Sequence, residues 1–524
     1  MKTKFTHLLL ILLGMLTPAS ASMNLTFDVS QLGNPDLNAS NVWVTFAGNS
    51  STMVYNPNGA SETINFSNNL INYGGTNYGT SKSYLLSDIA TNGLRIDVAQ
   101  SITGFISYGS TTGITQKNSG TQPDPLSQTT ARYSNFEFTY TGGNTGGANL
   151  TNITQFGGSL RMDFLAGSTT QSYVRNKLNT GDTFRALAAT SNNQTASTFS
   201  NSGNFVRVIG PNKFPASMNG VTYQNPYHSF EPYLQNLTNT YGSNASSNLT
   251  NLAPGASPGG TGATGVSSTS NATAVNPNAT YNLDYHFGSV TTAGTGGNGT
   301  SLVLSGYVNA TPTGGGTTTV YNNLSITIYG DNPSSSGDTA LSMTNFLYQQ
   351  NLASANVAAQ FSGWDAINND FGAANVSAAV QQKAANDFSQ GILDGFVGST
   401  YNTGNGTLGS LSSKEWWSMG TTLTGSVAQP TNSDFYSAWA NVVNGNSDGD
   451  NGGYFSRGGV YGSPYDDRFN LNTISPNAST TEMRITLLAD GTLAVPEPSS
   501  MLLLLLGSPA AFWIARRQKT RAKK

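Results

Sequence analysis

The stretch Phe136-Glu137-Phe138-Thr139-Tyr140 decides the fold class, because aromatic and polar side chains alternate along it with a period of two. This period is typical of a β-strand with one buried and one solvated face. Similar runs, each bounded by Gly, Asn or Ser, occupy residues 42–46, 102–108 and 160–164. We therefore predict that residues 22–237 are mainly β and form a barrel or a sandwich.

The second half of the chain has a different pattern. Residues 238–282 are rich in Ser, Asn, Gly, Ala, Thr and Pro and too poor in apolar side chains to fold alone, which predicts a loop insertion or linker. Strands are expected near residues 301–308 and 324–329. A core-facing helix is predicted from apolar residues at helical spacing, namely Val376, Ala379, Val380, Ala384, Phe388, Ile392 and Phe396. Residues 283–495 are thus expected to form a smaller mixed α/β half, with a ligand cleft between the halves.

The carboxyl end predicts where the protein goes. Pro496-Glu497-Pro498 is followed by an apolar segment at 501–515 and by six basic residues among the last nine. The apolar segment is shorter than the ~20 residues of a comfortable membrane span, which favours a transient anchor with its basic end in the cytoplasm. This layout resembles the PEP sorting signal of Gram-negative bacteria that make exopolysaccharide, in which an exosortase cuts near the tripeptide. An ordinary single-span tail anchor is the alternative.

The amino end predicts export. Two Lys residues precede an apolar run at 8–16, and Ala19-Ser20-Ala21 follows, so residues 1–21 are interpreted as a secretory signal peptide. The remaining residues 22–495 hold 15 basic and 25 acidic side chains, a formal net charge of −10. Because nucleic acids require clustered Lys and Arg, we expect no nucleic-acid partner. The expected location is the cell envelope, the cell surface or the exopolysaccharide matrix.

Common catalytic and metal-binding patterns are scarce. The chain has no Cys, which excludes disulfides, thiol nucleophiles and thiolate metal sites. Asn446, Asp448 and Asp450 alternate as the ligands of a calcium loop do, but Gly452 comes one place late and Arg457 stands where a bidentate Glu is needed. A solvated turn is the preferred interpretation there. We expect no cofactor and no metal.

Several short segments in a fixed order resemble the β-1,3-glucanases of glycoside hydrolase family 64. They are residues 102–109, the Glu-Phe-Thr-Tyr strand at 137–140, Ile153-Thr154-Gln155-Phe156-Gly157, Phe205-Val206-Arg207-Val208-Ile209 and Tyr461-Gly462-Ser463-Pro464-Tyr465-Asp466-Asp467. The resemblance spans roughly residues 24–487. It implies a β-barrel part and a mixed, thaumatin-like part separated by a wide groove, and inverting cleavage of β-1,3-glucan.

The same resemblance implies the site residues. Inversion requires two carboxyl groups about 6.5–9.5 Å apart, one as general acid and one as general base. The acid maps to Glu137, for which the alternative is an ordinary Glu on the wet face of a half-buried sheet. The base maps to Thr154, which is no carboxylate and cannot replace one at neutral pH. Asp163 lies downstream, but an ion pair with Arg161 explains it more simply. Sugar-binding or groove-shaping positions map to Tyr461, Tyr465, Asp466 and Asp467.

Two interpretations of different classes follow. The first is an exported β-1,3-glucan hydrolase with an altered base. The second is a non-catalytic carbohydrate-binding or exopolysaccharide-matrix protein that keeps the groove without turnover. Aromatic side chains such as Trp416 and Trp417 would stack on sugar faces in either case. The partners expected are a β-1,3-glucan or related polysaccharide, an exosortase and the secretion machinery.

Replacing Pro496, Glu497 and Pro498 together with Ala is expected to leave an uncut form in the membrane fraction, because the tripeptide would mark the processing site in front of the apolar segment. Immunoblots of membrane and released fractions would measure it. A triple variant that is processed and released like the parent would contradict the sorting hypothesis.

Overall fold

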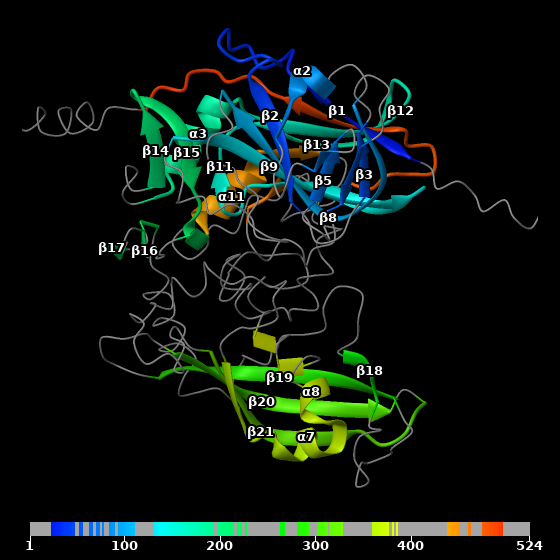
Figure 1. Ribbon diagram of the computed structural model, residues 1–524. Helices are drawn as coiled ribbons and strands as arrows, with labels where there is room; N and C mark the ends of the chain where they lie inside the picture. Colours follow the sequence, from blue (N-terminus) through cyan, green and yellow to red (C-terminus); the bar gives the residue numbers. More distant parts are fainter. Residues whose placement is uncertain are drawn as a thin grey trace, which may run out of the picture.

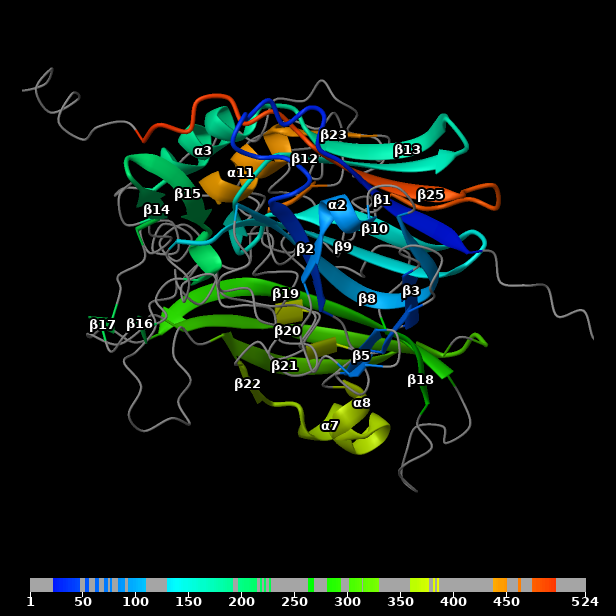
Figure 2. The ribbon, with the colours of Figure 1, turned by 45° about the horizontal axis from the view of Figure 1, so that its top comes forward.

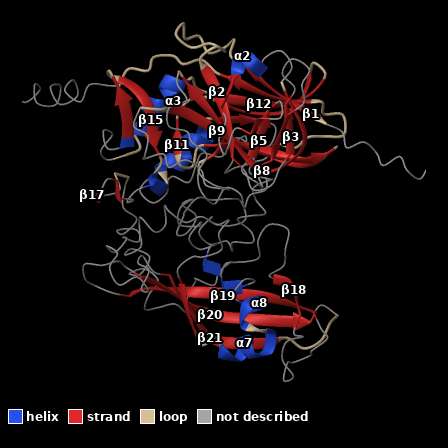
Figure 3. Ribbon diagram, in the orientation of Figure 1, coloured by secondary structure: helices blue, strands red, loops and turns tan. Residues whose placement is uncertain are grey.

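The computed structural model describes residues 22–47, 52–55, 62–65, 70–73, 76–77, 83–89, 93–109, 130–191, 197–213, 217–218, 221–222, 226–227, 263–267, 280–293, 301–312, 314–328, 359–376, 380–381, 384–385, 437–449, 460–462 and 474–495. Within these ranges strands predominate and the helices are short (Figure 1, Figure 3). The protein is mainly β, as the alternating sequence pattern predicts.

The largest sheet has 15 strands in two layers that share one long strand, β8. The order in the first layer is β23 (Ser447–Gly449), β13 (Thr169–Asn176), β12 (Leu160–Ala166), β25 (Glu482–Leu487), β1 (Met23–Asp28), β8 (Leu94–Tyr108), β3 (Thr52–Tyr55), β4 (Glu62–Asn65), β5 (Leu70–Tyr73) and β6 (Thr76–Asn77). The runs predicted at 102–108 and 160–164 lie in β8 and β12.

The second layer is built on the last part of β8. Its order is β7 (Ser83–Leu85), β2 (Val42–Ala47), β8, β9 (Arg132–Gly142), β10 (Thr145–Thr151) and β24 (Val460–Tyr461). The register of β8 with β9 shifts between Ala99 and Ile102, where β8 leaves β1 and β3 and takes β2 and β9 as partners. An irregularity of this kind bends a strand, and here it lets β8 serve both layers.

Aromatic rings fill the space between the two layers. Phe136 of β9 is fully buried, and its ring centroid lies 6.4 Å from that of Phe27 on β1 and 6.5 Å from that of Phe46 on β2. Gly104 lies opposite Phe136 on β8, and a Cβ atom there would come within 2.2 Å of the Phe136 ring. The ring therefore occupies the space that any other residue at position 104 would need.

The chain returns to its first strand near its carboxyl end. β25 pairs in parallel with β1 and antiparallel with β12, and Figure 2 shows it beside β1. The helix α11 (Ala438–Gly445) precedes β23 in the same region. The assignment of all of 283–495 to a separate mixed half is therefore wrong, because the described residues 438–449, 460–462 and 474–495 belong to the body built by the amino-terminal strands. Asn24 and Glu482 pair although they are 458 positions apart, and pairing at such a distance leaves no local sequence pattern.

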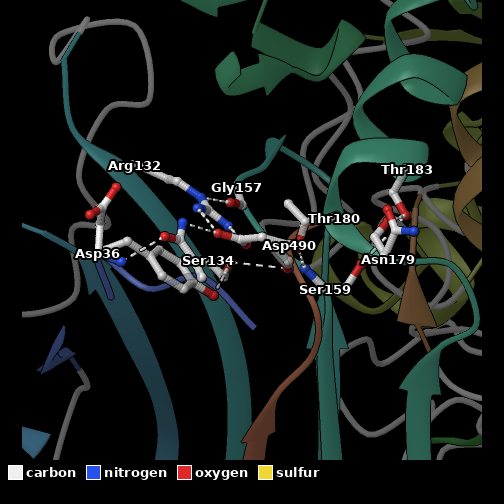
Figure 4. Close-up of polar contacts among 12 residues, drawn as sticks. Asp36, Arg132, Ser134, Gly157, Ser159, Asn179, Thr180, Thr183 and Asp490 are labelled. Carbon is white, nitrogen blue, oxygen red and sulfur yellow. Dashed lines mark hydrogen bonds and ion pairs between the residues drawn. The ribbon is translucent and has the colours of Figure 1, made fainter. Parts of the chain in front are cut away.

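A buried ion pair fastens this returning segment. Arg132 of β9 and Asp490 form a bidentate pair, in which Arg132 Nη1 lies 2.8 Å from Asp490 Oδ2 (Figure 4). Asn34 Nδ2 donates to the same carboxylate at 2.8 Å, and Arg132 Nε donates to the Gly157 carbonyl at 2.8 Å. The guanidinium lies 4.2 Å from the ring centre of Tyr108, where burial raises the pKa of the phenol to about 12 although the Arg132 charge acts in the opposite direction.

Smaller elements complete this body. A three-stranded sheet has the order β11 (Gln155–Phe156), β15 (Asn204–Ile209) and β14 (Thr198–Asn201), and β16 (Ser217–Met218) pairs with β17 (Val221–Thr222). Besides α11, the helices of this body are α2 (Leu86–Ile89), α3 (Thr180–Ala188) and the 3-10 helix η3 (Pro211–Lys213). Asn179 caps α3 by accepting from the Asp182 amide at 2.9 Å.

A separate five-stranded sheet has the order β18 (Ala263–Ser267), β19 (Thr280–Ala293), β20 (Ser301–Pro312), β21 (Thr319–Ile328) and β22 (Ala359–Ser362). Two short helices follow it, α7 (Asp365–Phe371) and α8 (Ala373–Val376). The strands predicted near 301–308 and 324–329 are confirmed, as β20 and β21. Because β18 lies inside 238–282, that segment is not wholly a loop or linker, contrary to the prediction from its composition.

The predicted helical stripe is found in part. Val376, Val380 and Ala384 are fully buried, as a core-facing stripe requires, and the described positions 380–381 and 384–385, beyond α8, are helical as well. Ala379, Phe388, Ile392 and Phe396 lie outside the described residues. The described strands form open sheets and no closed barrel, so the barrel alternative is wrong and the two-layered arrangement is confirmed. The wide groove stays a prediction.

Both predicted targeting segments, 1–21 and 496–524, lie outside the described residues. Within the described ranges, no helix is both long and apolar enough to cross a membrane.

Asp490→Asn is expected to lower the free energy of unfolding by about 3–5 kcal/mol, because it leaves the buried Arg132 charge without its carboxylate. Asp448→Asn is the matched control, since Asp448 pairs with Arg175 where the two side chains are 29% and 42% exposed. Exposed pairs contribute only about 0–1 kcal/mol. Urea unfolding would measure both, and equal losses in the two variants would contradict the account.

Candidate functional site

Strand β9 separates its side chains cleanly between two faces. Phe136, Phe138 and Tyr140 are buried in the core between the layers, whereas Glu137 and Thr139 on the opposite face are partly exposed. Glu137 therefore alternates away from the flanking aromatic residues, as the sequence predicts. Its neighbours across the strands are Thr103 on β8 and Asn149 on β10.

The side of the second layer that carries Glu137, called here the Glu137 face, is mainly polar. Strand alternation and register assign to it Thr103, Phe105 and Ser107 of β8, Tyr133, Asn135, Glu137 and Thr139 of β9, and Asn149 and Thr151 of β10. Most of these side chains are buried in spite of their polarity. A buried polar sheet face is uncommon, because each polar atom in it needs a hydrogen-bond partner.

Three polar atoms on the Glu137 face lack such a partner, two of them near Glu137, on Asn135 and Asn149, and the third on Ser107, which lies opposite Tyr133. Ser107 Oγ, Asn135 Oδ1 and Asn149 Oδ1 are buried and make no hydrogen bond in the described part of the chain. Their residues are only 1%, 4% and 6% exposed. An unsatisfied buried oxygen is costly unless water or a ligand hydroxyl reaches it. The three oxygens therefore keep hydrogen-bonding capacity that water or a ligand hydroxyl satisfies.

Thr154 lies at the Tyr133 end of this face. It follows β10 in a bend, is partly exposed, and accepts a hydrogen bond from the Gly210 amide through its carbonyl at 2.9 Å. The next residue, Gln155, donates through Nε2 to the Tyr133 carbonyl at 3.1 Å. Because Tyr133 precedes Glu137 by four residues, the end of the face next to the Thr154 bend lies roughly 13 Å from Glu137 along the strand direction.

A buried arginine supports the same end. Arg207 of β15 is 0% exposed, and its Nη1 donates to Tyr133 Oη at 3.0 Å and to Gln155 Oε1 at 3.1 Å. Its guanidinium lies 4.6 Å from the Tyr133 ring centre and 5.2 Å from that of Phe199. Gly157 lets the backbone approach the Tyr133 carbonyl closely, since a Cβ at position 157 would come within 1.8 Å of that oxygen. Arg207 thus links two of the motif segments that the sequence analysis identified.

The structure brings some predicted site residues together and leaves others outside the described part. Tyr461 of β24 lies opposite Thr151, so its side chain belongs to the Glu137 face, but it is only 3% exposed. Tyr465, Asp466 and Asp467, as well as Trp416 and Trp417, lie outside the described residues.

Asp163, the carboxylate considered in place of the missing base, is held in an ion pair, as expected, because Arg161 Nε lies 2.8 Å from its Oδ2. The segment at 446–448 is neither a calcium loop nor a solvated turn. Asn446 is 4% exposed and bonds to the Leu178 amide and to Thr183, while Asp448 lies in β23 and pairs with Arg175. The side chains of Asn446 and Asp448 are thus bonded within the protein, and Asp450 lies outside the described residues. In the described ranges no group of three or more His, Cys, Asp or Glu side chains could hold a metal ion.

Sequence analysis did not identify Ser107, Asn135, Asn149 or Arg207 as site residues. Asn135 precedes Glu137 by two positions, so the period of a strand could have placed it on the same face. Ser107 and Arg207 lie in two of the quoted motif segments, but those motifs do not mark them as individual site residues. For Asn149 no local signal exists, because strand pairing alone brings it to the site.

No protein-family model matches the sequence, and no curated protein matches it. Among solved structures, the chain is similar to a β-1,3-glucanase domain of glycoside hydrolase family 64 from Clostridium beijerinckii, at 13% identity and a TM-score of 0.45, covering 90% of this chain and 98% of the other. A laminaripentaose-producing β-1,3-glucanase in complex with laminaritetraose shows 13% identity and a TM-score of 0.39 over 90% and 99% of the two chains. Another such enzyme, from Paenibacillus barengoltzii, matches 39% of this chain and 52% of its own at 16% identity and a TM-score of 0.26. With TM-scores this low, the function has to be argued from the residues.

The opposite orientation of neighbouring side chains on β9 predicts opposite effects of substitution. Phe136→Ala is expected to lower the free energy of unfolding by about 3–5 kcal/mol, because it empties the space between the layers. Glu137→Gln, one residue away, is expected to change it by less than about 1 kcal/mol, because that side chain contributes nothing to the apolar core. Denaturant unfolding of both variants would measure this. A loss for Glu137→Gln as large as that for Phe136→Ala would show that Glu137 is a structural residue.

Proposed function

We propose that this protein is an exported β-1,3-glucan-binding protein whose Glu137 face contacts the polysaccharide. The observation that carries the proposal is a partly exposed Glu137 on a sheet face with three buried polar atoms that have no partner in the described part of the chain, on Asn135 and Asn149 near it and on Ser107 opposite Tyr133. Sugar hydroxyls both donate and accept hydrogen bonds, so a glucan chain satisfies such atoms. The ordered motif segments, which resemble those of family 64 β-1,3-glucanases, supply the identity of the sugar.

Glu137 has the role of the general acid in this proposal. A strand position between Thr103 and Asn149, with aromatic residues directly beneath, would present its carboxyl group to a bound glycosidic oxygen. The described positions of the Glu137 face contain no second carboxylate. Inversion needs one, because a water molecule has to be activated on the opposite side of the sugar ring.

The general base is missing because Thr154 stands at the position where the resemblance places a carboxylate. Its hydroxyl cannot take a proton from water as a carboxylate does at neutral pH. Tyr133, next to the Thr154 bend, lies roughly 13 Å along the strand from Glu137, so the 6.5–9.5 Å separation of an inverting pair would need the side chains at positions 137 and 154 to lean toward each other. We therefore propose that the native protein binds β-1,3-glucan and hydrolyses it weakly or not at all.

Export and surface sorting belong to the same proposal and rest on the sequence of the two chain ends. A signal peptide at 1–21 and the segment from Pro496 onward would deliver residues 22–495 to the envelope or to the exopolysaccharide matrix. A non-catalytic matrix protein is the second candidate function, and the observation that favours it is the hydroxyl of Thr154 at the position of the base.

Thr154→Asp is expected to raise the hydrolysis of laminarin by purified residues 22–495, because general-base assistance contributes about 10²–10⁴ in rate and part of this should return. Reducing-end release measures hydrolysis, and titration calorimetry measures binding. Adding Glu137→Gln to Thr154→Asp should abolish the gain in hydrolysis. Adding Glu482→Gln instead, on β25 of the first layer, should leave the gain unchanged.

Two results would contradict the proposal. Strong hydrolysis by the native protein that survives Glu137→Gln would assign the reaction to other residues. Absence of laminarin binding in the native protein would refute the glucan assignment, while binding without turnover in every variant would select the matrix-protein alternative.

A further inference from the structure

The five-stranded sheet β18–β22 has one buried face and one open face. The buried face packs on α7 and on Trp364, the residue directly before it. Trp364 stacks on Phe287 with 5.9 Å between the ring centroids, and the ring centroids of Phe371 and Tyr281 lie 5.0 Å apart. The open face carries Asp284 and His286 of β19 and Tyr307 and Asn309 of β20, which are paired across the two strands. Tyr307 is 36% exposed, although large aromatic side chains are usually buried.

Tyr307 is the centre of an ordered cluster. The His286 ring stacks on it at 4.7 Å between centroids with an angle of 21° between the ring planes. His286 Nε2 lies 3.1 Å from Asp284 Oδ2 and 3.5 Å from Asn309 Nδ2. The side chains of His286 and Asp284 are 31% and 56% exposed. One side of the Tyr307 ring is thus held in place by a residue that is itself anchored.

The hydrogen-bond chemistry leaves polar groups for a ligand. His286 Nε2 contacts both Asp284 Oδ2 and Asn309 Nδ2, and the direction of these hydrogen bonds depends on the imidazole tautomer. The Asn309 amide has a second N–H and a carbonyl oxygen, and Asp284 has a second carboxylate oxygen. Both residues therefore keep polar groups that can bind a ligand.

A β-bulge brings two further amides to the other side of Tyr307. Gly306 pairs with Leu324 and Val308 with Tyr321, so Asn322 and Asn323 of β21 together lie opposite Tyr307. Both are exposed, and Asn323 has φ +59°, in the left-handed region that Asn adopts more readily than most residues with a side chain. Bulges of this kind are over-represented next to active sites. A simple stabilising cross-strand pair would not require a bulge.

The charge of the sheet selects the class of ligand. Strands β18 to β22 contain no Lys or Arg, and Asp284 is their only acidic residue. A nucleic acid, an anionic lipid surface or an acidic polysaccharide requires clustered cations, which these strands do not supply. An exposed aromatic ring between carboxylate and amide groups suits a pyranose, whose apolar side stacks on the ring while its hydroxyls meet the polar groups.

We propose that the open face of this sheet is a second saccharide site, at which Tyr307 stacks on a neutral polysaccharide and Asp284, Asn309, Asn322 and Asn323 bind its hydroxyls. The site lies on a different sheet from Glu137, and the proposal does not depend on glucan binding at the Glu137 face. It would allow the protein to hold a polysaccharide at two places, which raises the overall affinity for a long chain.

Hydroxyl-radical footprinting of purified residues 22–495 tests the proposal, because it reports the exposure of individual Tyr side chains. Laminarin, a neutral polysaccharide, is expected to reduce the labelling of Tyr307 relative to Leu178, which is 43% exposed and serves as an internal reference. Alginate, a polyanion, should leave the ratio unchanged. Tyr307→Ala should weaken laminarin binding about tenfold in titration calorimetry, and Val320→Ala on the same face should not.

The Glu137→Gln variant distinguishes saccharide binding at Tyr307 from binding at the Glu137 face. Protection of Tyr307 that persists in this variant supports an independent second site, even if laminarin does not bind at the Glu137 face. Protection that disappears with Glu137→Gln would overturn the proposal of a separate site. Unchanged Tyr307 labelling with laminarin, or protection by alginate instead, would also overturn it.

Discussion

The alternation of side chains along β9 is the constraint on which the rest of the structure depends. Phe136 has to enter the space between the two layers, where it contacts rings from β1 and β2 and occupies the space left by Gly104. Because neighbouring residues of a strand point to opposite faces, this packing forces Glu137 to the other side of the sheet. A shift of one residue in register would bury the carboxylate in the core and expose the aromatic rings. The core thereby fixes the position of the candidate acid.

The chain ends of the folded body are held by long-range pairing. β25 lies between β1 and β12, and the segment after it contributes Asp490 to the pair with Arg132. Arg132 is the first residue of β9, and its Nε bonds to the carbonyl of Gly157 behind the Thr154 bend. The same clamp therefore fixes the start of the strand that carries Glu137 and the loop that carries Thr154. This connects the stability of the fold to the geometry of the candidate site.

Sequence patterns were sufficient where the determining contacts are local. The period of two located β2, β9 and β12 and the face of Glu137, because burial on one side of a strand leaves its mark in neighbouring residues. The return of β25 could not be predicted in this way, since its partner β1 lies more than 450 residues earlier. Asn135 and Asn149 could not be predicted as site residues either, because the chain is rich in Asn and only their position in the strand register beside Glu137 distinguishes them. The cluster at Tyr307 depends on a bulge, which no sequence pattern indicated.

The two candidate sites use the same physical device, a sheet face on which polar side chains surround a central residue. They differ in that the Glu137 face carries a reactive carboxylate and buried unsatisfied atoms, whereas the Tyr307 face is open. A crystal structure of residues 22–495 with laminarihexaose tests the central claim about the Glu137 face most directly. The account predicts sugar hydroxyls within about 3.2 Å of Asn135 Oδ1 and Asn149 Oδ1, with Glu137 directed at a glycosidic oxygen. A Glu137 face filled by the protein's own side chains, with those atoms bonded to them and no sugar present, would contradict it.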